Sequence, residues 1–190
     1  MLIFAQLEDA VIDRVKSASD SNALGYRLAH VESYGGEFDD ETFFTQFRKF
    51  PAVWVTVGGD KPKRVGRAWE CALTLAVMVG ARNVRGERFT RHGAVGEPGT
   101  YQMAQDVRDL LVLQNFDKMV APLSLGPTRT LFNTRQGNEA RSVLALEFTT
   151  TFTYRPPEPD DADLTGIDLR YYLKPGDDVA DATDTVTLGA

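Results

Sequence analysis

Residues 82–99 carry a regular pattern of side chains that could bind anions. Four arginines recur at every third position of this segment, and a histidine follows the last of them: Arg82, Arg85, Arg88, Arg91 and His92. Guanidinium groups form paired hydrogen bonds with carboxylates and phosphates, and Glu87 and Glu97 leave the segment with a net charge of +2. The pattern predicts a long loop that contacts an acidic protein surface or a nucleic acid, with a solvated hairpin extension as the alternative.

Residues suited to catalysis or metal binding are scarce. The single cysteine, Cys71, falls on the apolar side of a predicted strand, and the two histidines are His30 and His92. The sequence has neither a phosphate-binding loop nor a nucleophile elbow, and no acid adjoins His92 to orient it as a base. The acidic run at 37–41 lacks the spacing of a calcium loop. We therefore expect no enzyme, no cofactor and no metal site.

Composition limits the class of protein further. The chain has 190 residues, of which 43% are hydrophobic and 25% charged, and its net charge is -6. This length fits one domain with a tail, and the negative charge argues against a protein that coats nucleic acid. No run reaches the roughly 18–20 apolar residues of a membrane span, and the first residues lack the pattern of a signal peptide. The expected location is the cytoplasm or an assembly built there.

The negative charge is concentrated in the last part of the chain. Residues 156–190 contain nine acids and two bases, a net charge of -7, so residues 1–155 carry +1. We predict an α+β domain over 1–155 and an acidic C-terminal arm over 156–190, extended or disordered outside an assembly. The arm contains one apolar island with the candidate contact residues Ile167, Leu169, Tyr171, Tyr172 and Leu173. It is either a disordered tail or a strand that is added to a neighbouring subunit.

Hydrophobic periodicity in the first 155 residues predicts a mixed fold. Apolar residues at helical spacing predict helices, and alternation predicts strands. Residues 58–67 have the composition of a hairpin connection. We expect an α+β fold in which about three helices pack on a predominantly antiparallel sheet. The predicted helices are 2–19, 39–49 and 100–114, and the predicted strands are 26–33, 51–57, 69–79, 128–132 and 142–154.

Several segments, taken in order, resemble one known family. They are Tyr34–Phe38, Phe50–Val55, Ala81–Glu87 and Leu146–Thr150, together with the helices predicted at 3–15 and 101–111. Their order and spacing are similar to those of Mu-like phage and prophage proteins described as tail completion or tail terminator proteins. The resemblance covers about residues 1–155, and the acidic extension is longer than the family leads us to expect.

The resemblance implies a structural role in the virion. Tail terminators form a hexameric ring that caps the head-proximal end of the tail tube, stops its polymerisation and joins the tail to the head connector proteins. Their fold is a sheet with helices packed on one side. The implied partners are other copies of the chain, the tail tube protein and the connector, while DNA passes through the lumen without specific binding. Under this interpretation the segment 82–97 contacts the tube or lines the lumen, and the arm holds the next subunit.

Two other functions stay open at this point. One is a head-side connector or stopper protein of the neck, which belongs to the same particle. The other is a small nucleic-acid-binding module that uses the Arg82–Arg91 loop. A nucleic-acid binder shows affinity that falls steeply with salt, whereas a terminator assembles at tube ends.

Overall fold

The chain folds into two compact units in the computed structural model. Unit 1 is residues 1–155, and unit 2 is residues 156–190. The structure describes residues 3–36, 47–94, 96–136, 139–157, 166–176 and 178–187.

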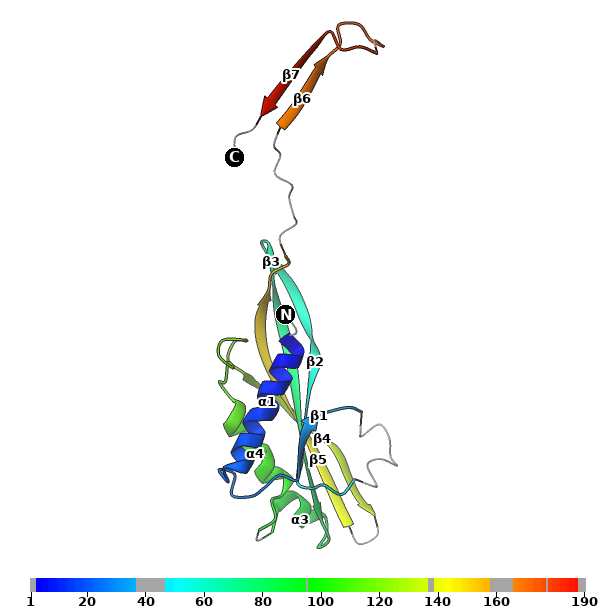
Figure 1. The fold of residues 1–190 in the computed structure, drawn as a ribbon. Coiled ribbons are helices and arrows are strands. Elements are labelled where there is room, and N and C mark those ends of the chain that lie inside the picture. The colour runs from blue at the N-terminus through cyan, green and yellow to red at the C-terminus, as the bar shows by residue number, and fades with distance from the viewer. Residues whose placement is uncertain are drawn as a thin grey trace. The chain divides into compact units, whose positions relative to one another are not determined.

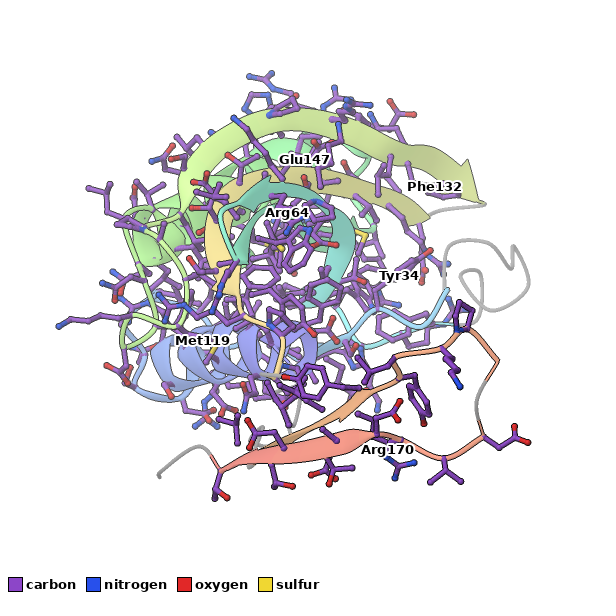
Figure 2. The ribbon with its side chains drawn as sticks, turned by 90° about the horizontal axis from the view of Figure 1, so that it is seen from above. Tyr34, Arg64, Met119, Phe132, Glu147 and Arg170 are labelled. Atoms are coloured by element: carbon purple, nitrogen blue, oxygen red, sulfur yellow. The ribbon has the colours of Figure 1, made fainter. Side chains whose placement is uncertain are left out.

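Unit 1 is built on a five-stranded sheet. Its strands are β1 (His30–Ser33), β2 (Ala52–Val65), β3 (Ala68–Asn83), β4 (Ser124–Gln136) and β5 (Glu139–Tyr154). The strand order is β1-β2-β3-β5-β4, and every neighbouring pair is antiparallel except the short pair of β1 with β2. Seen end-on, the sheet bends into an arc (Figure 2). The predicted fold class, a mostly antiparallel α+β sheet with about three helices, is confirmed.

Helices cover one face of this sheet and form the main core with it. Helices α1 and α4 lie side by side on the sheet, and α3 lies at the end opposite the β2–β3 turn (Figure 1). The helices are α1 (Ile3–Asp20), α3 (Glu87–His92) and α4 (Thr100–Leu111). Apolar residues three or four positions apart give α1 and α4 a buried stripe. Its members, such as Leu7, Val11, Met103 and Val107, pack against alternate residues of β3 and β5.

A smaller cluster lies on the opposite face of the sheet. Trp54 of β2 is fully buried there, and the rings of Phe47 and Phe50 pack against it at centroid distances of 5.3 and 6.3 Å. Gly80 is required beneath these rings, because a Cβ at that position would lie 2.8 Å from the Trp54 ring. Most of the helix predicted at 39–49 and the acidic run at 37–41 lie outside the described residues, and residues 47–49 are not helical.

The predicted connection at 58–67 is wrong, because most of it is strand. Strand β2 continues to Val65, and only Gly66 and Arg67 form the turn. Glycine and proline normally mark loops, but Gly59 sits at a bulge in the register, where its φ of 116° suits glycine. Pro62 pairs with β3 on one side only, because β1 ends much earlier, so its missing amide costs no ladder hydrogen bond.

Other predicted boundaries shift in unit 1. The strand predicted at 26–33 begins only at His30, and both C-terminal strands of the sheet are longer than expected. Helix α4 ends at Leu111 rather than at residue 114, because Leu113 takes a left-handed φ of 63° and donates its amide to the Leu123 carbonyl. The chain therefore leaves the helix direction at this point.

Unit 2 contains one antiparallel strand pair. The strands are β6 (Gly166–Tyr171) and β7 (Ala182–Thr187). The main-chain amide of Leu173 donates to the Asp181 carboxylate at 2.7 Å, and the Asp181 amide donates to the Tyr171 carbonyl at 2.8 Å. These bonds close the connection between the strands. The apolar island therefore pairs with a strand of its own unit.

Candidate functional site

The predicted long loop at 82–99 is wrong, and the structure gives its arginines different environments. Arg82 lies near the end of β3 and Arg85 in the turn that follows, whereas Arg88 and Arg91 lie on α3. Arg85, Arg88 and His92 are exposed, while Arg82 and Arg91 are half-buried. The three-residue spacing therefore does not produce one continuous row of free guanidinium groups.

Arg82 belongs to a charge cluster centred on Glu139, the first residue of β5. The Glu139 carboxylate lies 3.3 Å from Arg82, 3.4 Å from Arg141 and 3.7 Å from Arg48. Arg141 is the buried member. Burial lowers the pKa of its guanidinium, and the hydrogen bond to Glu139 opposes that shift. Sequence reasoning missed this cluster, because its members come from three distant segments.

The segment after α3 is packed rather than free. The Asn83 side-chain amide donates to the Glu97 carboxylate at 2.7 Å, and Ala94 and Glu97 exchange backbone hydrogen bonds at 2.9 Å. A Cβ on Gly99 would lie 2.3 Å from the Arg91 carbonyl oxygen, so only glycine fits this approach of two backbones. Glu97 thus ties the chain after α3 to β3, and Gly99 packs against the last turn of the helix.

The exposed part of α3 offers both charge and apolar surface. Thr90 anchors the helix by donating its hydroxyl to the Ala140 carbonyl at 3.3 Å, and His92 meets Tyr101 edge to face. Phe89 is 42% exposed beside the exposed Arg88. Arginine and aromatic side chains are enriched in protein–protein interfaces. We call this surface, with Arg85, Arg88 and Phe89, the α3 end.

A second surface lies at the other end of the sheet, where the β2–β3 hairpin extends past the start of α1 (Figure 1). An apolar groove of about 620 Å³ opens there. Its walls come from α1 and from three strands, and the sequence alone did not predict a groove here. We call it the tip groove; its lining includes Phe4, Pro62, Trp69, Cys71, Phe152 and Tyr154.

The groove exists because the sheet is longer than the helices that cover it. Trp69 and Cys71 share a face of β3 with the core residues Leu73 and Leu75, and the first residues of α1 that the structure describes, Ile3–Ala5, border the groove beside them. Arg64 lies 5.7 Å above the Trp69 ring, a cation–π contact at the rim. Figure 2 labels Arg64 in the view along the sheet.

Cys71 is a structural part of this groove. It is buried, and burial raises the pKa of its thiol, as does the hydrogen bond to Asp60. A buried thiol with a raised pKa carries little thiolate and is a poor nucleophile. The expectation that Cys71 is a small apolar residue of the strand fits this position.

The candidate arm residues lie on β6 and just after it. Ile167, Leu169 and Tyr171 alternate along the strand, while Tyr172 and Leu173 lie in the connection to β7. All five are exposed in unit 2.

Comparison with known families adds what geometry cannot. A model of the family described as Bacteriophage Mu, Gp37 matches residues 3–153. The chain belongs to the Bacteriophage Mu Gp37 family. This match covers nearly all of unit 1 and ends before unit 2. A search of curated proteins gave no match. The predicted resemblance to a Mu-like phage protein family is therefore confirmed. Membership of this family favours a structural component of the virion.

The surfaces of this Gp37-family chain suit binding. Within the described ranges, no three His, Cys, Asp or Glu side chains are grouped to hold a metal. No helix in those ranges is long and apolar enough to cross a membrane. The α3 end offers guanidinium groups to carboxylates, and the tip groove offers an apolar surface with Arg64 at its rim.

Proposed function

We propose that this Gp37-family chain is a tail terminator, which forms a ring at the head-proximal end of the tail tube and ends tube polymerisation. The observation that carries the proposal is the family match over unit 1. The proposed ring contains six copies, and its neighbours in the particle are the tube protein and the head connector.

The two surfaces of unit 1 support this role. A closed ring needs a head-to-tail contact, in which one patch of each subunit meets a different patch of the next. It also needs a further surface for the tube. The α3 end and the tip groove lie at opposite ends of the sheet (Figure 1), so both contacts can be made at once. We assign the α3 end to the tube, with Arg85 and Arg88 meeting acidic side chains.

Electron microscopy of particles made without this protein tests the role. We expect overlong tails or tails that are not joined to heads, and we expect full-length chain supplied in trans to restore the normal tail length. Heads that have packaged DNA and leak it, beside tails of normal length, would instead favour a stopper protein on the capsid side.

Duplex DNA binding tests the class of function. A terminator lets DNA pass, so we expect weak binding of the purified chain at physiological salt. Tight binding with affinity that falls steeply as salt rises, and that is lost in Arg85→Ala with Arg88→Ala, would replace the terminator proposal by a nucleic-acid-binding module.

A further inference from the structure

The strand pair of unit 2 has an apolar face that none of the described residues of this unit covers. Side chains directly opposite each other in an antiparallel pair lie on the same face, so Ile167 and Val186 join Leu169 and Tyr171. These four side chains are 42%, 41%, 39% and 51% exposed, and the carboxylate of Asp184, opposite Leu169, lies on the same face. A two-stranded hairpin alone is marginally stable in water. Its apolar face therefore requires another surface.

The tip groove has the shape and chemistry to supply that surface. It is an open concave site of about 620 Å³, and its walls are mainly aromatic and aliphatic. Trp69 and Tyr154 pair across the strands with ring centroids 6.2 Å apart, and Tyr154 is 51% exposed. Aromatic walls of this kind receive alternate side chains such as Leu169 and Tyr171.

Charge complements shape at this site. Unit 2 belongs to a segment with a net charge of -7, and its polar side chains include Asp168, Asp181 and Asp184. Arg64 lies over the Trp69 ring at the rim of the groove, whereas Asp60 lines its wall and Lys61 and Lys63 alternate onto the opposite face of β2. Opposite charges at a rim guide association and fix orientation.

The connection between the units favours a second copy over the same chain. Strand β5 ends at Tyr154, in the wall of the groove itself, and the sequence then continues Pro156-Pro157-Glu158-Pro159. Proline-rich segments are extended and stiff. A hairpin that docked into its own groove would need the chain to reverse its direction after this stiff start, so we assign the groove of a second copy.

We infer that the apolar face of the β6–β7 hairpin in one copy docks into the tip groove of a second copy. This contact joins two different patches, as a ring requires. The inference rests on the proposed ring for its closure. It assigns to the arm a receiving surface made of Phe4, Trp69, Phe152 and Tyr154.

Photocrosslinking of full-length chains tests the contact. One pool carries p-benzoylphenylalanine in place of Tyr171, and the other is uniformly ¹⁵N-labelled without it. The pools are unfolded, mixed, refolded together and illuminated, and crosslinked peptides are identified by mass spectrometry. We expect light arm peptides joined to heavy peptides that contain Trp69 or Tyr154. Crosslinks only within light chains, crosslinks to other heavy peptides, or none at all would overturn the inference.

Two matched variants separate the docking face from general effects of charge. Ile167→Asp places a carboxylate on this face opposite the uncharged Val186, and we expect at least a tenfold loss of the light–heavy crosslink. Thr183→Asp adds the same charge on the opposite face, across from Arg170, and is expected to keep the crosslink. Equal losses in both variants would contradict the assigned face.

The result is distinguishable from failure of the proposed function. Overlong tails without this protein, combined with absent light–heavy crosslinks, would keep the terminator and remove the docked arm. Normal tails combined with the expected crosslinks would keep the self-contact and remove the terminator.

Discussion

The two ends of the sheet in unit 1 both carry basic residues, but they use them differently. At one end, Arg82 and the buried Arg141 share the Glu139 carboxylate, so much of the positive charge is compensated within the fold. At the other end, the bases of the β2–β3 hairpin are exposed, and one of them, Arg64, lies at the rim of an apolar groove. Arginine spacing in the sequence drew attention to the first end only. Burial and partners, rather than charge alone, decide which basic surface is available for binding.

The largest expected effect is on assembly. Deleting residues 156–190 removes the hairpin that we dock into the tip groove. Losing the burial of its apolar side chains weakens subunit association by about 4 kcal/mol, or about a thousandfold. Mass photometry across a dilution series measures this. Unit 1 keeps its own core, so its circular dichroism spectrum is expected to be unchanged. If the ring still forms after truncation, the arm is not needed for subunit association.

The packing behind α3 gives the next largest effect. Gly99→Ala places a Cβ 2.3 Å from the Arg91 carbonyl oxygen, and we expect a loss of about 3 kcal/mol in the free energy of unfolding. Gly96→Ala is the control, because that site has open space and only a left-handed φ of 78°; its expected cost is about 1 kcal/mol. Urea denaturation measures both. Equal costs would mean that Gly99 is not packed against Arg91.

The charge cluster centred on Glu139 predicts an effect on the free energy of unfolding. Glu139→Gln removes the carboxylate that Arg82 and the buried Arg141 share. Because Glu139 is itself 30% exposed, solvent screens part of the loss, and we expect about 2 kcal/mol. Glu87→Gln removes the same charge from the exposed first turn of α3 and is expected to change stability by about 0.5 kcal/mol or less. If Glu139→Gln leaves the free energy of unfolding unchanged in chemical denaturation, these arginines do not stabilise the fold through Glu139.

The tip groove predicts the converse, an effect on association with little on folding. Tyr154→Asp charges its wall at a half-exposed position, and we expect about tenfold weaker assembly, or about 1.4 kcal/mol. Thr153→Asp makes the same change on the opposite face of β5 and is expected to assemble normally. Sedimentation velocity compares them. Equal behaviour of the two variants would count against the groove as an interface.

The smallest expected effect concerns the exposed arginines. Arg85→Ala with Arg88→Ala removes side chains that lie in solvent, so the free energy of unfolding changes by about 0.5 kcal/mol or less. Pull-down of tail tube protein, in contrast, is expected to weaken. A large loss of thermal stability would place these two residues with Arg82, inside the fold.

Periodicity predicted the parts of the fold whose patterns are long. The helix at Ile3–Asp20 and the strand at Glu139–Tyr154 repeat their apolar positions over many residues, so their type was predictable. Helix α3 was not predicted, because six residues hold too few turns to show a period. The prediction ended strand β2 at Val57, because glycine and proline are typical of loops. The strand continues past this point because its bulge and its open edge tolerate both residues.

The candidate surfaces likewise have features that the sequence predicted and features that only the tertiary structure decided. The sequence alone determined the composition of each part, including the acidic arm, the apolar alternation at Ile167, Leu169 and Tyr171, and the arginines at 82–91. Only the tertiary structure decided which of these are available. Glu139 meets Arg48 and Arg82 across distant segments. Trp69 and Tyr154 line a groove because the helices are shorter than the sheet. Both outcomes depend on where separate elements end in space, which local sequence patterns do not encode.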